Sequence, residues 1–307
     1  MAGGHLGRDG DVTDLCARSI DVIAAGQAPS GAYSAAPTFG PYRDYCWFRD
    51  GSFIADAMSR AGETSSAERF FDWGAEIVRA EPAGPWDARY HLDGSRDETS
   101  WWPHEQLDGT GLWVWAIRNH VARHRIESRW DDAIALVATS LAAHWRDPCY
   151  DWWEERSGVH AVTLGSIWAG IGGDELAREA HAACTEERLD GSHAFLVVLG
   201  LADGGHLERI ERELGYHRHA DDEYYGGGEW PILAAFTGWG RRTLGLDASE
   251  QLEWIESAPT VDAMLPEQLG EQLRPECYDS WVARWGTTAS PLLWSHAMYL
   301  TLLDVLG

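Results

Sequence analysis

The sequence of 307 residues contains no lysine, and its 24 basic residues are all arginine. Against them stand 49 acidic residues, which give a formal net charge of −25 at pH 7. A surface this negative repels phosphate backbones and anionic lipid headgroups, so neither nucleic acid nor an anionic membrane is an expected partner. It suits a salt-rich cytoplasm, as in a halophile, where ions screen charge repulsion beyond a few ångströms. A high-GC genome explains arginine in place of lysine, but not the excess of acid.

Long apolar runs and paired cysteines are also missing. No segment approaches the roughly 18 apolar residues of a membrane-spanning helix, and residues 1–14 lack the apolar core of a secretion signal. The five cysteines include no C-x-x-C pair, which argues against a zinc site and favours free thiols in a reducing cytoplasm. We therefore expect a cytoplasmic protein. Because the chain has no low-complexity linker and no abrupt change of composition, residues 1–307 are expected to form a single domain.

Hydrophobic periodicity predicts helices along nearly the whole chain. The predicted helices span residues 11–25, 51–61, 65–78, 109–122, 130–145, 160–170, 176–184, 204–214, 231–236, 249–255 and 291–306. Ser65 and Glu68 have the spacing of a capping box, and Asp93-Gly94 predicts a hairpin within residues 89–98. Repeated helix–loop units of this kind fit twelve helices, arranged as six helical hairpins.

Tryptophan is abundant, with 18 residues. Several of them stand beside acids or glycines: Trp47, Trp101, Trp102, Trp152, Trp153, Trp230 and Trp294. Sugar rings have apolar C–H faces and polar rims, so an indole next to a carboxylate suits a sugar-binding subsite. Plain core packing is the alternative interpretation, and it is expected to hold for about half of the tryptophans.

Two acidic segments are candidates for acid–base chemistry. Residues 151–158, DWWEERSG, place three carboxylates against two indoles, and apolar neighbours raise the pKa of a carboxyl so that it stays protonated near neutral pH. Glycoside hydrolysis needs such an acid and a second carboxyl across the scissile bond. Glu267, between Pro266 and Gln268, is the candidate partner. An acidic helix start beside core tryptophans, and a helix-start glutamate after proline, are the alternatives.

Other polar residues next to aromatic rings are candidates for binding sugar hydroxyls. Arg49 and Asp50 form an expected ion pair within YCWFRDGSF, although a helix N-cap with a structural arginine has the same pattern. Arg218 lies in HRHADDEYY, whose histidine and acidic residues are also compatible with a metal site or a solvated acidic loop.

These segments together resemble glycoside hydrolase family 15, the glucoamylase family, whose motifs occur in the same order between residues 45 and 297. The matching segments are WFRD at 47–50, WWPHEQLDG at 101–109, DWWEE at 151–155, YYGGGEW at 224–230, PEQ at 266–268 and PLLWSHA at 291–297. The resemblance implies an all-α (α/α)6 barrel, a six-hairpin toroid with its site at one end of the inner helices. It also implies an inverting, exo-acting hydrolase that needs no cofactor and releases β-glucose from α-linked disaccharides, gluco-oligosaccharides or short α-glucans.

Carried over by position, the resemblance assigns Glu154 as the general acid and Glu267 as the general base. Residues that it implies for substrate binding are Trp47, Arg49, Asp50, Trp102, Asp151, Trp153, Glu155 and Arg218. Among them, Asp151 is expected beside the acid as a supporting carboxylate, and no metal ligand is implied. An inverting enzyme leaves room for water, so its two carboxyls are expected about 6.5–9.5 Å apart.

The chain also departs from the resembled family. It is short, and we expect neither the N-terminal β-sandwich of many prokaryotic members nor a starch-binding module. Trp152 stands where leucine is common, and Gly270 where polar residues are common. Maltooligosaccharides, isomaltose, dextrin and trehalose all stay open as substrates.

Two other functions stay open beside hydrolysis of neutral glucosides. One is a catalytically silent sugar-binding or regulatory protein on the same scaffold, and retention of both Glu154 and Glu267 argues against it. The other is a different (α/α)6 enzyme acting on acidic sugars, for which arginines would supply a cationic pocket. The order of the motifs does not favour that enzyme.

Overall fold

The computed structural model describes residues 8–99, 102–258 and 261–307, which form thirteen α-helices and four short strands. Six helices form an inner ring: α2 (Phe48–Arg60), α4 (Asp108–His124), α6 (Ala161–Ile171), α8 (Ala194–Val198), α10 (Pro231–Thr243) and α13 (Leu293–Leu306). Six more surround them: α1 (Arg8–Ala25), α3 (Thr64–Ala80), α5 (Asp131–His144), α7 (Asp174–Glu186), α9 (Gly204–Glu213) and α11 (Ser249–Ser257). The thirteenth helix, α12 (Pro275–Trp285), lies outside this alternation.

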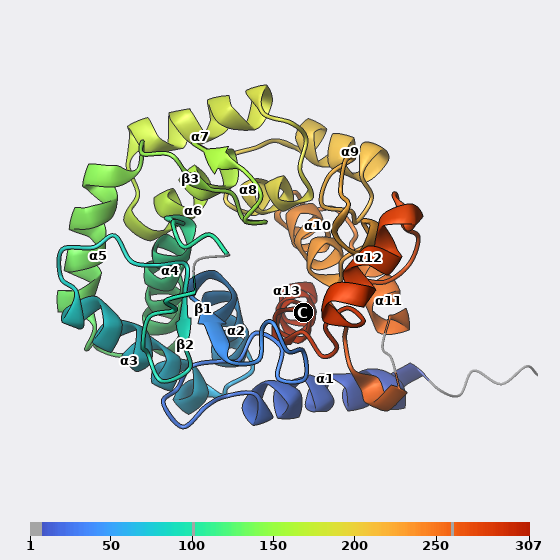
Figure 1. The fold of residues 1–307 in the computed structure, drawn as a ribbon, viewed down its shortest axis with the longest axis horizontal. Helices are drawn as coiled ribbons and strands as arrows, with labels where there is room; N and C mark the ends of the chain where they lie inside the picture. The colour runs from blue at the N-terminus through green and yellow to red at the C-terminus, as the bar shows by residue number, and fades with distance from the viewer. Residues whose placement is uncertain (1–7, 100–101, 259–260) are drawn as a thin grey trace, which may run out of the picture.

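The two rings alternate along the chain, and the inner ring closes on itself (Figure 1). Each inner helix packs against the next inner helix, and α13, the last of them, packs against α2, the first. Outer helices fill the space behind, as α7 does against α6 and α11 against α10. This arrangement confirms the predicted (α/α)6 barrel.

Burial explains which helices are inside. In α2, every residue from Phe48 to Ser59 is buried, because neighbours surround this helix on all sides. The outer helix α5 buries only Ala133, Val137, Ser140 and Leu141, the spacing of one narrow stripe. Helices that are buried on all sides therefore occupy the inner ring, and helices that are buried along one side only form the outer ring.

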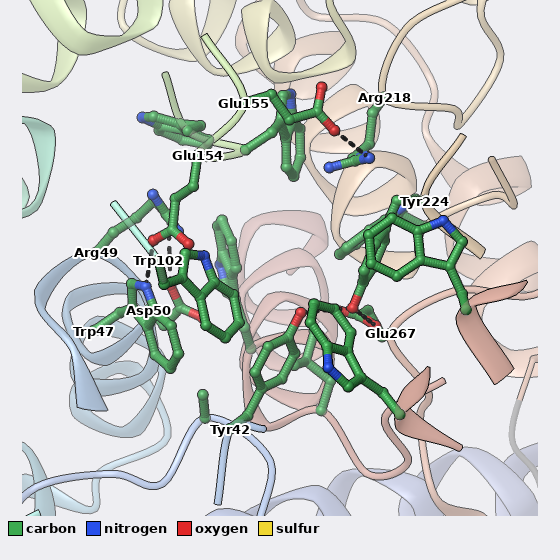
Figure 2. A pocket seen from close by; sticks show the side chains of 18 of the residues that line it. Tyr42, Trp47, Arg49, Asp50, Trp102, Glu154, Glu155, Arg218, Tyr224 and Glu267 are labelled. Carbon is green, nitrogen blue, oxygen red and sulfur yellow. Dashed lines mark hydrogen bonds and ion pairs between the residues drawn. The ribbon is translucent and has the colours of Figure 1, made fainter. Parts of the chain in front are cut away.

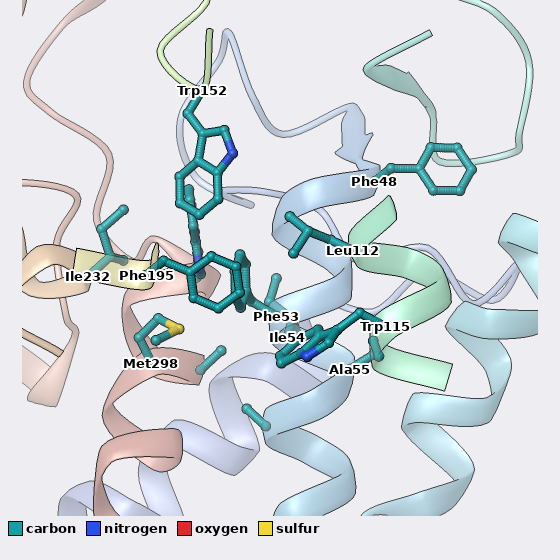
Figure 3. Packing of buried hydrophobic residues seen from close by; sticks show 14 of the residues in the cluster. Phe48, Phe53, Ile54, Ala55, Leu112, Trp115, Trp152, Phe195, Ile232 and Met298 are labelled. Atoms are coloured by element: carbon teal, nitrogen blue, oxygen red, sulfur yellow. The ribbon is translucent and has the colours of Figure 1, made fainter. Parts of the chain in front are cut away.

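Aromatic rings fill the centre of the barrel (Figure 3). The ring of Phe53 on α2 lies 5.2–5.8 Å, between centroids, from five aromatic rings of other segments: Trp115, Trp152, Phe195, Phe236 and Trp294. Tilted and edge-on pairs at such distances stabilise a core beyond the apolar area that they bury. This cluster ties α2, α4, α8, α10 and α13 together at one level of the barrel.

Two small two-stranded sheets interrupt the helices. Strand β1 (Tyr45–Trp47) pairs antiparallel with β2 (Arg89–His91), and β3 (Cys149–Tyr150) pairs antiparallel with β4 (Ser157–Gly158). The hairpin predicted around Asp93-Gly94 is confirmed, since Gly94 N–H donates to His91 and Gly94 adopts a φ of +87°.

One prediction about local structure was wrong, and not every helix was predicted. Glu68 does not complete a capping box, because α3 begins after Glu63 without a side-chain cap, and the Glu68 carboxylate instead lies 2.8 Å from Arg129 on the protein surface. Helix α12 was not predicted, and it contains no buried residue. None of the helices in the described part of the chain is long and apolar enough to cross a lipid bilayer.

Replacing Phe53 with alanine should lower the free energy of unfolding by roughly 3–5 kcal/mol, the usual loss when a packed phenylalanine is truncated. The ring is 1% exposed and meets five other rings, so the space is not easily refilled. Urea denaturation would measure the change. Leu246→Ala, at a side chain 43% exposed, is the matched control and should change stability by no more than about 0.5 kcal/mol. Equal losses in both variants would contradict the role of this cluster.

Candidate active site

A cavity of about 380 Å³ lies where three inner helices begin (Figure 2). Arg49 and Asp50 belong to the first turn of α2, Trp230 immediately precedes α10, and Trp294 is the second residue of α13. Helix N-termini carry partial positive charge and favour electron-rich groups. Most of the remaining residues of the wall come from segments that precede inner helices.

Glu154 stands at the tip of the hairpin between β3 and β4. Asp151 N–H donates to the Arg156 carbonyl, and Glu154 N–H donates to the Asp151 carbonyl, so the tip is a closed turn. Glu154 adopts a φ of +60°, a left-handed conformation that is uncommon for a residue with a side chain. The turn therefore directs this carboxyl into the cavity, and the segment is not the helix start considered as an alternative.

The Glu154 carboxyl is surrounded by apolar rings. Burial raises its pKa to about 7, against the opposing effect of the Arg49 and Arg89 guanidinium groups. The indole N–H of Trp47 donates to Glu154 Oε1 and also favours the charged form. A carboxyl with this pKa is substantially protonated near neutral pH and is able to donate a proton.

Glu267 faces Glu154 from the opposite side of the cavity (Figure 2). Its segment is fastened to α13: Leu265 N–H donates to His296 Nε2 at 3.0 Å, and Ser295 Oγ donates to the Pro266 carbonyl at 2.8 Å. Burial lowers the pKa of His296 to about 3, so the ring is neutral and Nε2 is free to accept. These contacts hold the glutamate in a fixed position.

Two tyrosines complete the surroundings of Glu267. Tyr224 donates its hydroxyl to Glu267 Oε2 at 3.2 Å, and the hydroxyls of Tyr42 and Tyr224 are 2.6 Å apart. Burial raises the pKa of Glu267 to about 7, while the hydroxyl of Tyr42 and the charge of Arg218 oppose the rise. Neither tyrosine was among the predicted site residues, although Tyr224 opens the motif at 224–230 and Tyr42 stands shortly before the motif at 47–50.

Arg49 and Asp50 form the predicted ion pair, with Nε and Oδ2 3.4 Å apart. The guanidinium also contacts Gln106 at 3.2 Å and Asp108 at 3.5 Å, and it stacks over Trp294 at 5.5 Å. Burial raises the pKa of Asp50 to about 6 despite the neighbouring arginine. Asp50 Oδ2 and Arg49 Nε are both buried, and within the described residues they make no hydrogen bond beyond this ion pair.

Arg218 organises the other side of the cavity. Its guanidinium donates to Glu155 at 2.8 Å and to both oxygens of Asp222, and His219 Nε2 lies 2.9 Å from Glu155. Burial alone would raise the pKa of Glu155, but Arg218 and His219 outweigh it and lower that pKa to about 2. The acidic cluster proposed as a possible metal site is thus held by an arginine.

Indole rings form most of the apolar wall. Of the seven tryptophans singled out in the sequence, six line the cavity, and Trp101 lies outside the described residues. Trp281 and Trp285 on α12 add two more rings, and Trp285 stacks on Trp102 with centroids 5.9 Å apart. Sequence reasoning missed these two, although Tyr278, Trp281, Val282 and Trp285 have the spacing of one apolar stripe and are partly buried against the core.

Nine of the ten predicted site residues line this one cavity: Trp47, Arg49, Asp50, Trp102, Trp153, Glu154, Glu155, Arg218 and Glu267. Asp151 does not line it. Its Oδ1 accepts the backbone N–H of Glu155 at 2.9 Å, so this carboxylate shapes the hairpin tip from behind. We therefore place Asp151 as a support of the turn, apart from the groups that face a ligand.

Sequence comparison agrees with this geometry. The profile of glycosyl hydrolases family 15 matches residues 10–280. The isomaltose glucohydrolase of Kribbella flavida is 35% identical, over 96% of this chain and 93% of its own. An uncharacterized glycosyl hydrolase of Methanocaldococcus jannaschii is 25% identical, over 88% of this chain and 52% of its own.

Solved structures show the same fold. A glycosidase variant in complex with glucose superposes with a TM-score of 0.91 at 34% identity, covering 99% of both chains. A bacterial glucoamylase complexed with acarbose shares the fold, with a TM-score of 0.73 at 18% identity over 96% of this chain and 56% of its own. The barrel, the pocket and these matches together define a glycoside hydrolase. The chain belongs to glycosyl hydrolases family 15.

Replacing Glu267 with glutamine should stabilise the protein at pH 8 and leave its stability nearly unchanged at pH 4. The folded state raises the pKa of Glu267 from 4.5 to about 7. The contribution of this carboxyl to the free energy of unfolding is therefore fully present below pH 4.5, and it is lost as the pH rises through 7. Since 1.36 kcal/mol corresponds to a difference of 1 in pKa, the gain at pH 8 should reach at most about 3 kcal/mol.

Urea denaturation of both proteins at the two pH values would measure this gain. Glu179→Gln, at an exposed position of the outer helix α7, is the matched control and should show no such pH dependence. A gain for Glu267→Gln of the same size at pH 4 and pH 8 would mean that ionisation of this carboxyl is not responsible.

Proposed function

We propose that the protein is an inverting, exo-acting glycosidase that releases β-glucose from small α-linked glucosides. The observation that carries this proposal is a pair of carboxyls, Glu154 and Glu267, which face each other across an aromatic-lined cavity and both have a pKa raised to about 7. Glycoside hydrolysis by inversion uses such a pair, one carboxyl as acid and the other as base.

Glu154 acts as the general acid in this proposal. Its protonated carboxyl donates to the glycosidic oxygen as the bond to the anomeric carbon breaks, and the leaving sugar departs as a neutral alcohol. The resulting carboxylate is stabilised by the Trp47 N–H and by the nearby Arg49 and Arg89 charges. These groups, which lower the pKa, thus offset the cost of forming a charge in an apolar wall.

Glu267 acts as the general base. It takes a proton from a water molecule that attacks the opposite face of the anomeric carbon, so the product has inverted configuration. The tyrosine hydroxyl at 3.2 Å and the anchored 265–267 segment orient the carboxylate for this task. Two carboxyls about 6.5–9.5 Å apart leave space for that water.

The polar and aromatic residues around the pair bind the sugar. Arg49 and Asp50 line the cavity as an ion pair, and in this proposal they donate to and accept from two sugar hydroxyls. The guanidinium of Arg218 and the carboxylate of Glu155, held together at 2.8 Å, bind further hydroxyls. Trp47 and Trp102 pack against the apolar C–H faces of the ring.

An α-1,6-linked disaccharide is the substrate that we favour. The relative of known activity that matches nearly the whole chain is named for hydrolysis of isomaltose. Trp102 and Trp285, stacked on each other at the cavity, provide an apolar surface for the second sugar of a short substrate. Maltose, maltotriose and trehalose are the alternatives to be measured beside isomaltose.

Proton NMR of fresh reactions with these four sugars tests the proposal. The β-anomer of glucose should appear before mutarotation, and isomaltose should be hydrolysed fastest. The α-anomer appearing first would mean retention and would overturn the pairing of Glu154 with Glu267. No hydrolysis of any of them by folded protein would favour a silent sugar-binding protein, and turnover of uronides alone would favour an enzyme for acidic sugars.

Replacing Glu154 with glutamine should lower kcat roughly 10²–10⁴-fold on isomaltose, the usual contribution of a general acid. An aryl glucoside whose leaving group needs no protonation should lose much less. Glu267→Gln should slow both substrates alike, since every substrate needs the activated water. Glu179→Gln serves as the control with unchanged rates. Equal losses on both substrates for Glu154→Gln would contradict its role as the acid.

A further inference from the structure

A thiol and two imidazoles meet behind the wall of the active site, in a place that the proposed reaction does not use. Cys184 lies in the last turn of α7, His193 in the short 3-10 helix η1 (Gly191–His193), and His206 in the first turn of α9. One sulfur and two ring nitrogens from these residues all lie within 4.8 Å of one another. Helices α7 and α9 are neighbours in the outer ring (Figure 1), so three separate elements converge there.

The spacing suits a tetrahedral cation with sulfur and nitrogen ligands. Bonds of about 2.3 Å to sulfur and 2.0–2.1 Å to nitrogen, at a tetrahedral angle, place the two ligand atoms about 3.6 Å apart. Cys184 Sγ and His206 Nε2 are separated by 3.3 Å. A shift of a few tenths of an ångström would therefore admit an ion.

His193 provides a second and independent observation. The side chain is 2% exposed, and its Nδ1 has no hydrogen-bond partner within the described residues. Its other nitrogen, Nε2, lies 3.5 Å from Glu187 Oε2. At metal centres, the ring nitrogen of a histidine that does not bind the metal usually donates to a carboxylate, which orients the ring. The carboxylate thus occupies Nε2 and leaves Nδ1 for a ligand.

We propose that Cys184, His193 and His206 form a binding site for Zn²⁺ or a similar thiophilic divalent cation. A thiolate with two imidazoles matches the ligand preference of zinc, and a water molecule would complete four-fold coordination. The site is distinct from the sugar pocket and does not depend on the function proposed above.

The surroundings indicate a structural task for the ion. Glu187 also accepts the N–H of Ala161 at the start of α6 and lies 3.4 Å from His160. The ring of His160 in turn contacts the carbonyl of Arg156, which closes the hairpin carrying Glu154. A bound cation would therefore immobilise η1, α7 and α9 and, through Glu187, support the hairpin from behind.

Titration of the metal-free protein with Co²⁺ and Zn²⁺ tests the site. One equivalent of Co²⁺ should bind and produce a thiolate-to-cobalt absorption band, and Zn²⁺ should displace it. Excess Zn²⁺ should also raise the thermal unfolding midpoint, because a ligand that binds only the folded state stabilises it. These readouts need no sugar substrate, so they stand whether or not hydrolysis is found.

Variants separate this site from other thiols and histidines. Cys184→Ser should abolish the band, and His206→Gln, at a half-buried position, should weaken Zn²⁺ binding about tenfold or more. Glu187→Gln should keep the band at saturating Co²⁺ but weaken affinity roughly 10–100-fold. Cys277→Ser, which removes a thiol elsewhere, should change nothing. A band that persists in Cys184→Ser, or no binding by the folded parent protein, would show that the cluster is only hydrogen-bonded.

Discussion

Removal of water from two carboxyls is the constraint on which this structure depends. Burial is the largest influence on Glu154 and on Glu267, and it raises the pKa of each to about 7. The rings that exclude the water are also the rings that close the barrel: Trp152 and Trp294 line the cavity and at the same time pack against Phe53 at its centre. Packing and chemistry therefore share the same side chains, and loosening the aromatic cluster would let water lower both pKa values.

Three glutamates of the pocket differ in pKa because their hydrogen-bond partners differ. Glu155 is bonded by the guanidinium of Arg218 and by His219, and its pKa falls to about 2 despite burial. Glu154 and Glu267 receive hydrogen bonds from an indole and a tyrosine, which are neutral donors, and burial prevails there. Carboxyls of one chemical kind are thus sorted into a permanent anion and two groups with a pKa near 7, which is the division that the proposed roles in binding and proton transfer require. The sorting comes from geometry, since Glu154 and Glu155 are adjacent in the chain.

Much of the fold and the site was predictable from the sequence, for identifiable reasons. Helices buried in stripes leave a periodic pattern, and nine site residues stand in motifs that combine aromatic rings with charge. What escaped prediction depends on contacts between distant segments. The hydroxyl of Tyr42 meets that of Tyr224, 182 residues away, only in the folded chain, and no residue of α12 is fully buried. The carboxylate of Glu68, which was expected to cap a helix N-terminus, instead accepts a hydrogen bond from Arg129, 61 residues away. Cys184, His193 and His206 likewise escaped a search for closely spaced ligands, because the fold and not the spacing brings them together.

The position of the pocket explains how such a barrel accommodates different substrates. Glu154, Arg218 and Glu267 all lie in loops or hairpins that lead into inner helices, while the helices themselves are bound by aromatic and aliphatic packing. Trp152, beside Glu154 in its hairpin, is the point where such a loop also enters the central aromatic cluster. Loops of this kind need their own anchors, and the structure provides them: His296 fastens the segment before Glu267, Asp222 holds Arg218, and Asp151 closes the turn of Glu154. Because each anchor contacts backbone or a charged group and does not line the cavity, the positions of Glu154, Arg218 and Glu267 are set from outside the pocket.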